Sequence, residues 1–303
     1  MGGVAVVFPG QGGQTVAMGV PWRDAPGWWI VDRASDVLDE DLAALLLTAD
    51  AERLARTRDA QLAVLLTSLV AWESDPLRHD DSVVAMAGHS LGQVTALVAS
   101  GVLSIDNGVR FAAQRADATQ AAADAHPGRM AALLGGTIDQ ATSACAAAPS
   151  AAWVANDNAP GQVVIAGTPA GVDTATNRAQ ELGVRKSVSL NVGGAFHTPL
   201  MDPARDGLVA ALDGIELSTG RVPVVGNADA APHRDAEGWR SRLVDHIVSP
   251  VRWRDSQLAL VALGATELVE MGGPGTLAAM AKRTVPDIEC RVVNAPTVGA
   301  SAA

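Results

Sequence analysis

The segment GHSLG at residues 88–92 constrains the fold of this chain more than any other. It fits the pattern G-x-S-x-G and follows residues 82–87, a short apolar run typical of a buried strand. Residues 93–99, which come next, are suited to open a helix. A strand that turns directly into a helix strains the serine and exposes its Oγ, while the two glycines avoid clashes in the turn. The segment therefore predicts a nucleophile at Ser90 in an α/β fold; a glycine-rich turn with a structural serine is the alternative.

Composition limits the classes of protein that remain. Of the 303 residues, 48% are hydrophobic and 18% are charged, which suits one large α/β domain, or one domain with an insertion, rather than a disordered chain. The net charge of −11 argues against a general nucleic-acid or anionic-membrane binder. No uncharged apolar run reaches about 18 residues, so we expect no membrane span.

The first residues read as a strand and not as a signal peptide. The two cysteines, Cys145 and Cys290, lie far apart and outside any metal-binding pattern. We therefore expect a cytoplasmic protein with free thiols and no metal site.

Changes in the hydrophobic pattern divide the chain into a core and an insert. Residues 128–192 follow the order strand, helix, strand, strand, helix, strand, which is that of a ferredoxin-like unit. We predict an α/β-hydrolase-like core with a parallel sheet, formed by residues 1–127 and 193–295, with this small α+β domain inserted and a flexible tail at 296–303. The glycine-rich loop at 9–14 lacks the pattern of a P-loop or of a dinucleotide fingerprint, which disfavours nucleotide binding.

A nucleophilic serine needs a base, and His197 is the leading candidate among six histidines. It lies in an irregular segment between apolar residues, where catalytic groups are often placed, although structural packing is the alternative. No aspartate between Ser90 and His197 is an evident third member of a triad, so we expect a dyad whose histidine is held by a backbone carbonyl. Solvated loops, a helix end or packing beside the predicted strand explain four others: His79, His233, His126 and His89.

Seven segments, in order along the chain, resemble the motifs of malonyl-CoA:acyl carrier protein transacylases and of polyketide-synthase acyltransferase domains. They are FPGQGGQ (8–14), GHSLG (88–92), RADATQ (115–120), NDNAPGQVVIAG (156–167), AFHTPLM (195–201), PVRW (250–253) and GPGTL (273–277). They cover nearly the whole chain, and the resemblance implies the same inserted ferredoxin-like domain.

The resemblance implies a ping-pong acyltransferase, a malonyl-CoA:ACP S-malonyltransferase that needs no metal or other cofactor. A malonyl group would pass from malonyl-CoA through an acyl-Ser90 intermediate to the phosphopantetheine thiol of an acyl carrier protein, with His197 as the base. The backbone N–H groups of Gln11 and Leu91 would form the oxyanion hole, and Arg115 would hold the malonyl carboxylate.

The resemblance also implies a set of supporting residues. Gln61, Thr119, Asn158 and Phe196 would contact substrate, and the backbone carbonyl of His246 would orient the catalytic histidine. The AFH motif, which contains Phe196, favours malonyl over methylmalonyl groups.

Four residues depart from the family pattern. Gln93 replaces the usual Glu, Thr119 a Met, Leu62 a Pro, and His246 occupies a position that is often Gln. We expect Gln93 to weaken local support without removing the chemistry, Thr119 to alter the room or polarity around the acyl chain, and the imidazole of His246 to perturb the pKa of a nearby histidine.

Three other functions stay open at this point. A discrete acyltransferase of a polyketide assembly line would load an unusual acyl unit, and a thioesterase would use water as the acceptor, although Arg115 argues against it. A non-catalytic module that binds carrier proteins is disfavoured by the presence of both Ser90 and His197.

Overall fold

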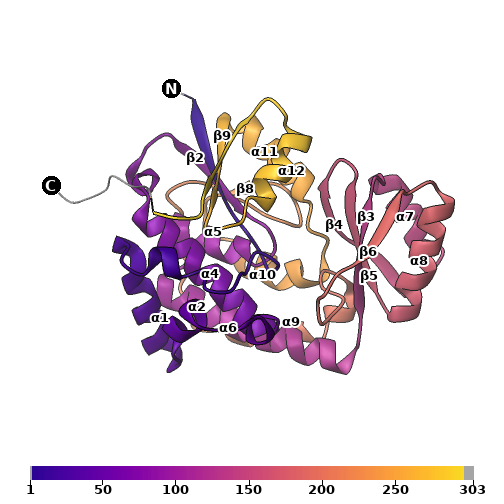
Figure 1. Ribbon diagram of the computed structural model, residues 1–303, viewed down its shortest axis with the longest axis horizontal. Helices are drawn as coiled ribbons and strands as arrows, with labels where there is room; N and C mark the ends of the chain where they lie inside the picture. Colours follow the sequence, from indigo (N-terminus) through magenta and orange to yellow (C-terminus); the bar gives the residue numbers. More distant parts are fainter. Residues whose placement is uncertain (1, 297–303) are drawn as a thin grey trace.

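The computed structural model describes residues 2–296 as two lobes, each built on its own sheet (Figure 1). The larger lobe contains β1 (Gly3–Phe8), α1 (Trp29–Leu38), α2 (Leu42–Leu47), α3 (Ala51–Leu54), α4 (Thr57–Ser74), β2 (Val83–Gly88), α5 (Gly92–Ser100), α6 (Ile105–Ala125), α9 (Ala204–Leu212), β7 (Val224–Val225), β8 (Pro232–His233), α10 (Trp239–Asp245), α11 (Trp253–Ala262), β9 (Ala265–Met271), α12 (Thr276–Thr284) and β10 (Glu289–Val293). The smaller lobe contains β3 (Arg129–Leu134), α7 (Ile138–Cys145), β4 (Ala152–Ala159), β5 (Gln162–Gly167), α8 (Pro169–Glu181) and β6 (Lys186–Ser189).

The larger lobe has a six-stranded sheet in the order β10-β9-β1-β2-β7-β8. All its pairings are parallel except the last, β7 with β8. The two-residue strand β8 is absent from the sequence prediction, because so short a run carries no alternating pattern. The predicted α/β core with a parallel sheet is otherwise confirmed.

Alternating side chains of β1 bury both faces of this sheet. Val4, Val6 and Phe8 join the core formed with α1, α2, α4, α5 and α6. Ala5 and Val7 point the other way and pack with residues of α11 and α12. Two covered faces explain why the strand reads as a continuous apolar run.

The smaller lobe has the predicted ferredoxin-like arrangement. Its four strands form an antiparallel sheet in the order β4-β5-β3-β6, and its helices α7 and α8 enclose a separate core with it. Figure 1 shows this lobe at one end of the molecule. The expected domain boundaries, at 127/128 and 192/193, fall in loops and stay a prediction.

The register of β1 on β2 brings the two glycine-rich segments together. Phe8 pairs with Gly88, so both strands end at the same edge of the sheet. The loop at 9–14 and the turn at 88–92 therefore lie side by side, where ligands of open α/β sheets bind.

Two sequence predictions concern the C-terminal tail and membrane spans. Apart from Pro296, the expected tail at 296–303 lies outside the described residues. Within residues 2–296, none of the helices combines the length and the apolar character that crossing a membrane requires.

Candidate active site

Ser90 lies in a sharp turn between β2 and α5. Its φ of 53° is in the left-handed region, which side chains rarely adopt. A Cβ on Gly88 would overlap the backbone of Gly92, and one on Gly92 would overlap the carbonyl of Phe8. The turn can therefore form only with glycines on both sides of the serine, as the pattern predicts.

His197 faces this turn and is held by the main chain of another segment. The hydroxyl of Ser90 donates to Nε2 of His197 at 2.8 Å, and Nδ1–H of His197 donates to the carbonyl of His246 at 3.0 Å. The backbone N–H of His197 donates to the carbonyl of Ile247 at 3.1 Å, and its φ is 62°. These bonds fix the tautomer that leaves Nε2 free to accept the serine proton.

The imidazole of His197 is held neutral by its surroundings. Burial, and after it the positive charge of Arg115, lower the pKa of His197 to about 3, against the opposing effect of the bond to His246. At neutral pH the ring is therefore a free base.

Arg115 places a buried cation beside the serine. Its guanidinium donates to Oε1 of Gln61 at 2.6 Å and to Oγ of Ser90 at 3.4 Å, and only 4% of the residue is exposed. Burial lowers the pKa of Arg115 to about 10, so the side chain stays charged at neutral pH. In the part of the chain that the structure describes, its hydrogen-bond partners are neutral groups and no carboxylate pairs with it.

Ser90, His197 and Arg115 line a cavity of about 230 Å³ between the two lobes. Five other residues that the sequence predicts also line it: Gln11, Gln61, Leu91, Asn158 and Phe196. Among residues 2–296, the lining does not include Thr119, whose hydroxyl donates instead to the carbonyl of Ala116 at 3.0 Å.

Two backbone N–H groups at the cavity are available to a ligand. Within the described chain, the N–H groups of Gln11 and Leu91 donate to no protein acceptor. Leu91 directly precedes α5, whose dipole adds positive potential at this end. Such a pair of donors suits an oxyanion.

Asn227, which the sequence did not predict as a site residue, holds the turn of Ser90 by hydrogen bonds to its backbone. The backbone N–H of Ser90 donates to its Oδ1, and its Nδ2 donates to the carbonyl of Gly88, both at 2.7 Å. Its own N–H donates to Oε1 of Gln93 at 2.7 Å, and the residue is fully buried. The available signal was its place two residues after β7, a strand that neighbours β2.

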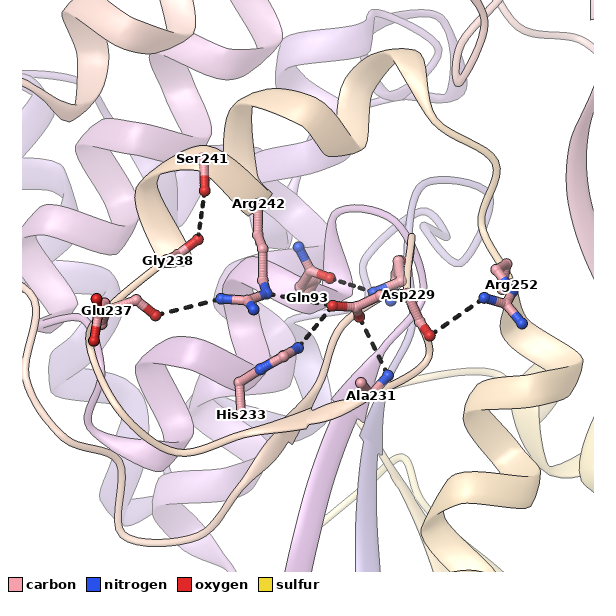
Figure 2. A network of polar contacts seen from close by, with 10 residues as sticks. Gln93, Asp229, Ala231, His233, Glu237, Gly238, Ser241, Arg242 and Arg252 are labelled. Carbon is pink, nitrogen blue, oxygen red and sulfur yellow. Dashed lines mark hydrogen bonds and ion pairs between the residues drawn. The ribbon is translucent and has the colours of Figure 1, made fainter.

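Asp229, two residues after Asn227, fixes the same loop on its outer side, and Figure 2 shows the contacts of Asp229. The carboxylate of Asp229 accepts from the N–H of Ala231 (3.2 Å), from His233 (2.7 Å) and from Arg242 (3.3 Å). Its carbonyl accepts from Arg252 at 3.3 Å. Burial alone would raise the pKa of Asp229, but the donors at Ala231, His233 and Arg242 outweigh it and lower this pKa.

Two other histidines have structural partners. His233 was expected in a solvated loop, and this is wrong: besides its bond to Asp229, its ring packs edge-on against Trp239, with centroids 5.7 Å apart. His89 shares a 2.9 Å hydrogen bond with Oδ1 of Asn158 and packs against Trp253. In residues 2–296, no group of three or more His, Cys, Asp or Glu is arranged to hold a metal ion.

Comparison with known proteins identifies the family to which this chain belongs. A family model described as an acyl transferase domain matches residues 5–299. The malonyl CoA-acyl carrier protein transacylase of Bacillus subtilis (strain 168) is 34% identical over 98% of this chain and 95% of its own length. The chain belongs to the malonyl-CoA:acyl carrier protein transacylase family. The predicted acyltransferase class is thereby confirmed.

Solved structures of this transacylase family superpose closely on the whole chain. The malonyl-CoA:acyl carrier protein transacylase of Xanthomonas oryzae pv. oryzae has a TM-score of 0.92 and 37% identity, covering 98% of this chain and 96% of that one. A malonyl-transacylase solved in complex with a type II polyketide-synthase acyl carrier protein has a TM-score of 0.91 and 33% identity, covering 97% and 96%.

Proposed function

We propose that this protein transfers a malonyl group from malonyl-CoA to the phosphopantetheine thiol of an acyl carrier protein, through an ester on Ser90. The observation that carries the proposal is the guanidinium of Arg115, 3.4 Å from Oγ of Ser90 and without a carboxylate partner among the described residues. A buried charge is stable when it is paired, and the free carboxylate of a malonyl group supplies the missing partner.

In the first half of the reaction, Oγ of Ser90 attacks the thioester carbonyl carbon while its proton passes to Nε2 of His197. The N–H groups of Gln11 and Leu91 stabilise the oxyanion that forms. The C–S bond then breaks, and the imidazolium returns the proton to the thiolate of coenzyme A. Arg115 holds the malonyl carboxylate throughout by a two-pronged ion pair.

The second half runs in reverse with a new thiol. The carrier thiol gives its proton to His197, its sulfur attacks the ester carbonyl, and Ser90 leaves and regains the proton. The neighbour solved with a carrier protein supports this choice of acceptor.

The free thiols of Cys145 and Cys290 support the cytoplasmic location that the sequence suggests.

Intact-mass spectrometry after mixing with malonyl-CoA tests the proposal. We expect one malonyl group on the wild type, none on Ser90→Ala and little on Arg115→Ala. Arg110→Ala is the matched control, because it removes an exposed charge from the same helix, α6, and should acylate like the wild type. Parallel reactions with acetyl-CoA and methylmalonyl-CoA measure the acyl preference.

The fate of the ester separates the alternatives. Rapid loss only when carrier protein is added supports transfer, whereas equally rapid loss into buffer would identify a thioesterase. No adduct from any of the three donors, on a folded protein, would overturn the malonyl assignment in favour of an unusual acyl unit.

A further inference from the structure

A second imidazole packs directly against the ring of His197. The ring centroids of His197 and His246 are 4.8 Å apart and their planes are tilted by 33°. His246 is 3% exposed. It therefore contacts His197 twice, through the carbonyl that accepts from Nδ1–H and through its own ring. The sequence predicts the carbonyl role and an effect of the His246 imidazole on the pKa of a nearby histidine, but it does not predict this ring contact.

Gln93 fixes which atoms of His246 carry a proton. Oε1 of Gln93 accepts the backbone N–H of Asn227 at 2.7 Å, which only the carbonyl end of the amide can do. Nε2 of Gln93 must then face Nδ1 of His246, at 3.5 Å. Figure 2 shows Gln93 beside the loop of Asp229. Because the amide nitrogen only donates, Nδ1 of His246 has to be an acceptor, which puts the ring proton on Nε2.

The surroundings of His246 disfavour a positive charge on its ring. Its Nε2 is buried and, within residues 2–296, has no hydrogen-bond partner. The titratable and charged side chains that act on it are His197, Arg115 and His89, all of which oppose a cation. Burial and these neighbours lower the pKa of His246 well below its ordinary value. A protonated ring would also turn an N–H of His246 toward the N–H of Gln93.

We propose that Gln93 and His246 are positioning residues for the general base: the amide of Gln93 keeps the His246 ring uncharged, and this uncharged ring packs against His197. The inference rests on the roles of Ser90 and His197 in the proposed function. During acyl transfer His197 becomes an imidazolium, and a second cation in contact with it would raise the energy of that state.

The test is a double-mutant cycle at positions 93 and 246, read as kcat/KM for acylation by malonyl-CoA. Gln93→Glu puts a carboxylate against Nδ1 of His246 and raises the pKa of that ring. We expect about a tenfold or larger loss at pH 7 that deepens toward acid, since the ring gains its proton as pH falls. His246→Gln alone keeps the backbone carbonyl but removes the ring that packs against His197, so we expect a loss of about threefold to fivefold that is the same at every pH. Added to Gln93→Glu, it should bring activity back to the level of His246→Gln alone and abolish the new pH dependence, because an amide takes up no proton.

A matched control and a direct measurement complete the cycle. Gln257→Glu makes the same change at another buried glutamine, one that donates to the carbonyl of Asn158, and His246→Gln should not rescue it. Imidazole ¹⁵N NMR of the wild type should show His246 as a single neutral Nε2–H tautomer between pH 5 and 8.

Each outcome decides one question. A Gln93→Glu defect that His246→Gln leaves unchanged, or a wild-type pH profile in Gln93→Glu, would overturn the inference. A charged or Nδ1–H His246 in the NMR spectrum would overturn it even where a variant fails to fold. Failure of the wild type to acylate would instead refute the proposed function, and the NMR result would still report the state of His246.

Discussion

Arg115 and Asp229 are charged residues near the Ser90 turn, and they differ in whether the protein provides partners for their charge. At the cavity, the cation of Arg115 is buried and bonds only to neutral groups of the described chain. Away from the cavity, the anion of Asp229 is partly exposed, and its oxygens are filled by Ala231, His233 and Arg242 (Figure 2).

This difference assigns ligand binding to Arg115 and structural support of the Ser90 turn to the cluster around Asp229. The filled cluster around Asp229 holds the loop of Asn227, and Asn227 holds the turn of Ser90. Because Arg115 has no anionic partner among the described residues, it can form an ion pair with the carboxylate of a ligand. Changes at the cavity should therefore act on substrate selection, whereas changes at the Asp229 loop should act mainly on stability.

The largest effect is expected from Arg115→Leu. Loss of a buried charge pair of about 3–4 kcal/mol should lower kcat/KM for malonyl-CoA by about 10²–10³-fold. Acylation by acetyl-CoA, which has no carboxylate, should be unchanged, and the melting temperature should not fall, because an unpaired buried cation is gone. Steady-state kinetics with both donors checks this. An equal loss for both donors would mean that Arg115 supports Ser90 and does not select the substrate.

Asn227→Ala should have the next largest effect. It leaves the buried N–H of Ser90 without an acceptor, which we expect to lower the free energy of unfolding by about 2–3 kcal/mol. Loss of the fixed turn should lower kcat by about tenfold for malonyl and acetyl groups alike. Urea unfolding and kinetics measure the two effects, with Asn177→Ala on the exposed side of α8 as the matched control. Wild-type kcat in Asn227→Ala would contradict the idea that this residue positions the serine.

Asp229→Asn should have a smaller effect, confined to stability. Since its ion pairs with His233 and Arg242 are partly exposed, we expect a loss of about 0.5–1 kcal/mol that shrinks in high salt. Activity should stay within about threefold of wild type, because Asn227 keeps its own bonds. A drop in kcat larger than that of Asn227→Ala would show that the outer cluster, and not Asn227, controls the serine.

The smallest effect is expected from mild acid. Because burial and Arg115 lower the pKa of His197 to about 3, its free base persists as pH falls, and activity is lost only as pH approaches that value. We expect kcat/KM to change by less than about twofold between pH 7 and 5, where an ordinary histidine would lose about 25-fold. Below about pH 6.5, His197 binds a proton in the unfolded chain but not in the native state, so acid lowers the stability of the fold. Activity should therefore be measured by a pH-jump assay, before the protein unfolds. An inflection near pH 6.5 would refute the prediction.

Local sequence patterns predicted most elements and the position of Ser90. The apolar run before Gly88 and the glycines around the serine act over a few residues, so a single segment carries the information. The ferredoxin-like insert was predictable for the same reason, from the order of short alternating and helical runs. His197 was identified from its irregular apolar segment and from the family resemblance.

Contacts between distant segments were not predictable in this way. Asn227 is 137 positions from Ser90, and His246 is 153 positions from Gln93, so each pair meets only through the packing of whole elements. Thr119 shows the limit of the resemblance: it lies one turn from Arg115 on α6, yet its hydroxyl turns back to its own helix.

The positive φ angles of Ser90 and His197 bear on how this chain can change. At both positions the backbone adopts a left-handed conformation that glycine or asparagine adopts with less strain. A population of variants selected for heat resistance alone would therefore be expected to drift toward those residues at positions 90 and 197. The two positions on which the proposed chemistry depends are thus also among those that a search for stability alone would replace.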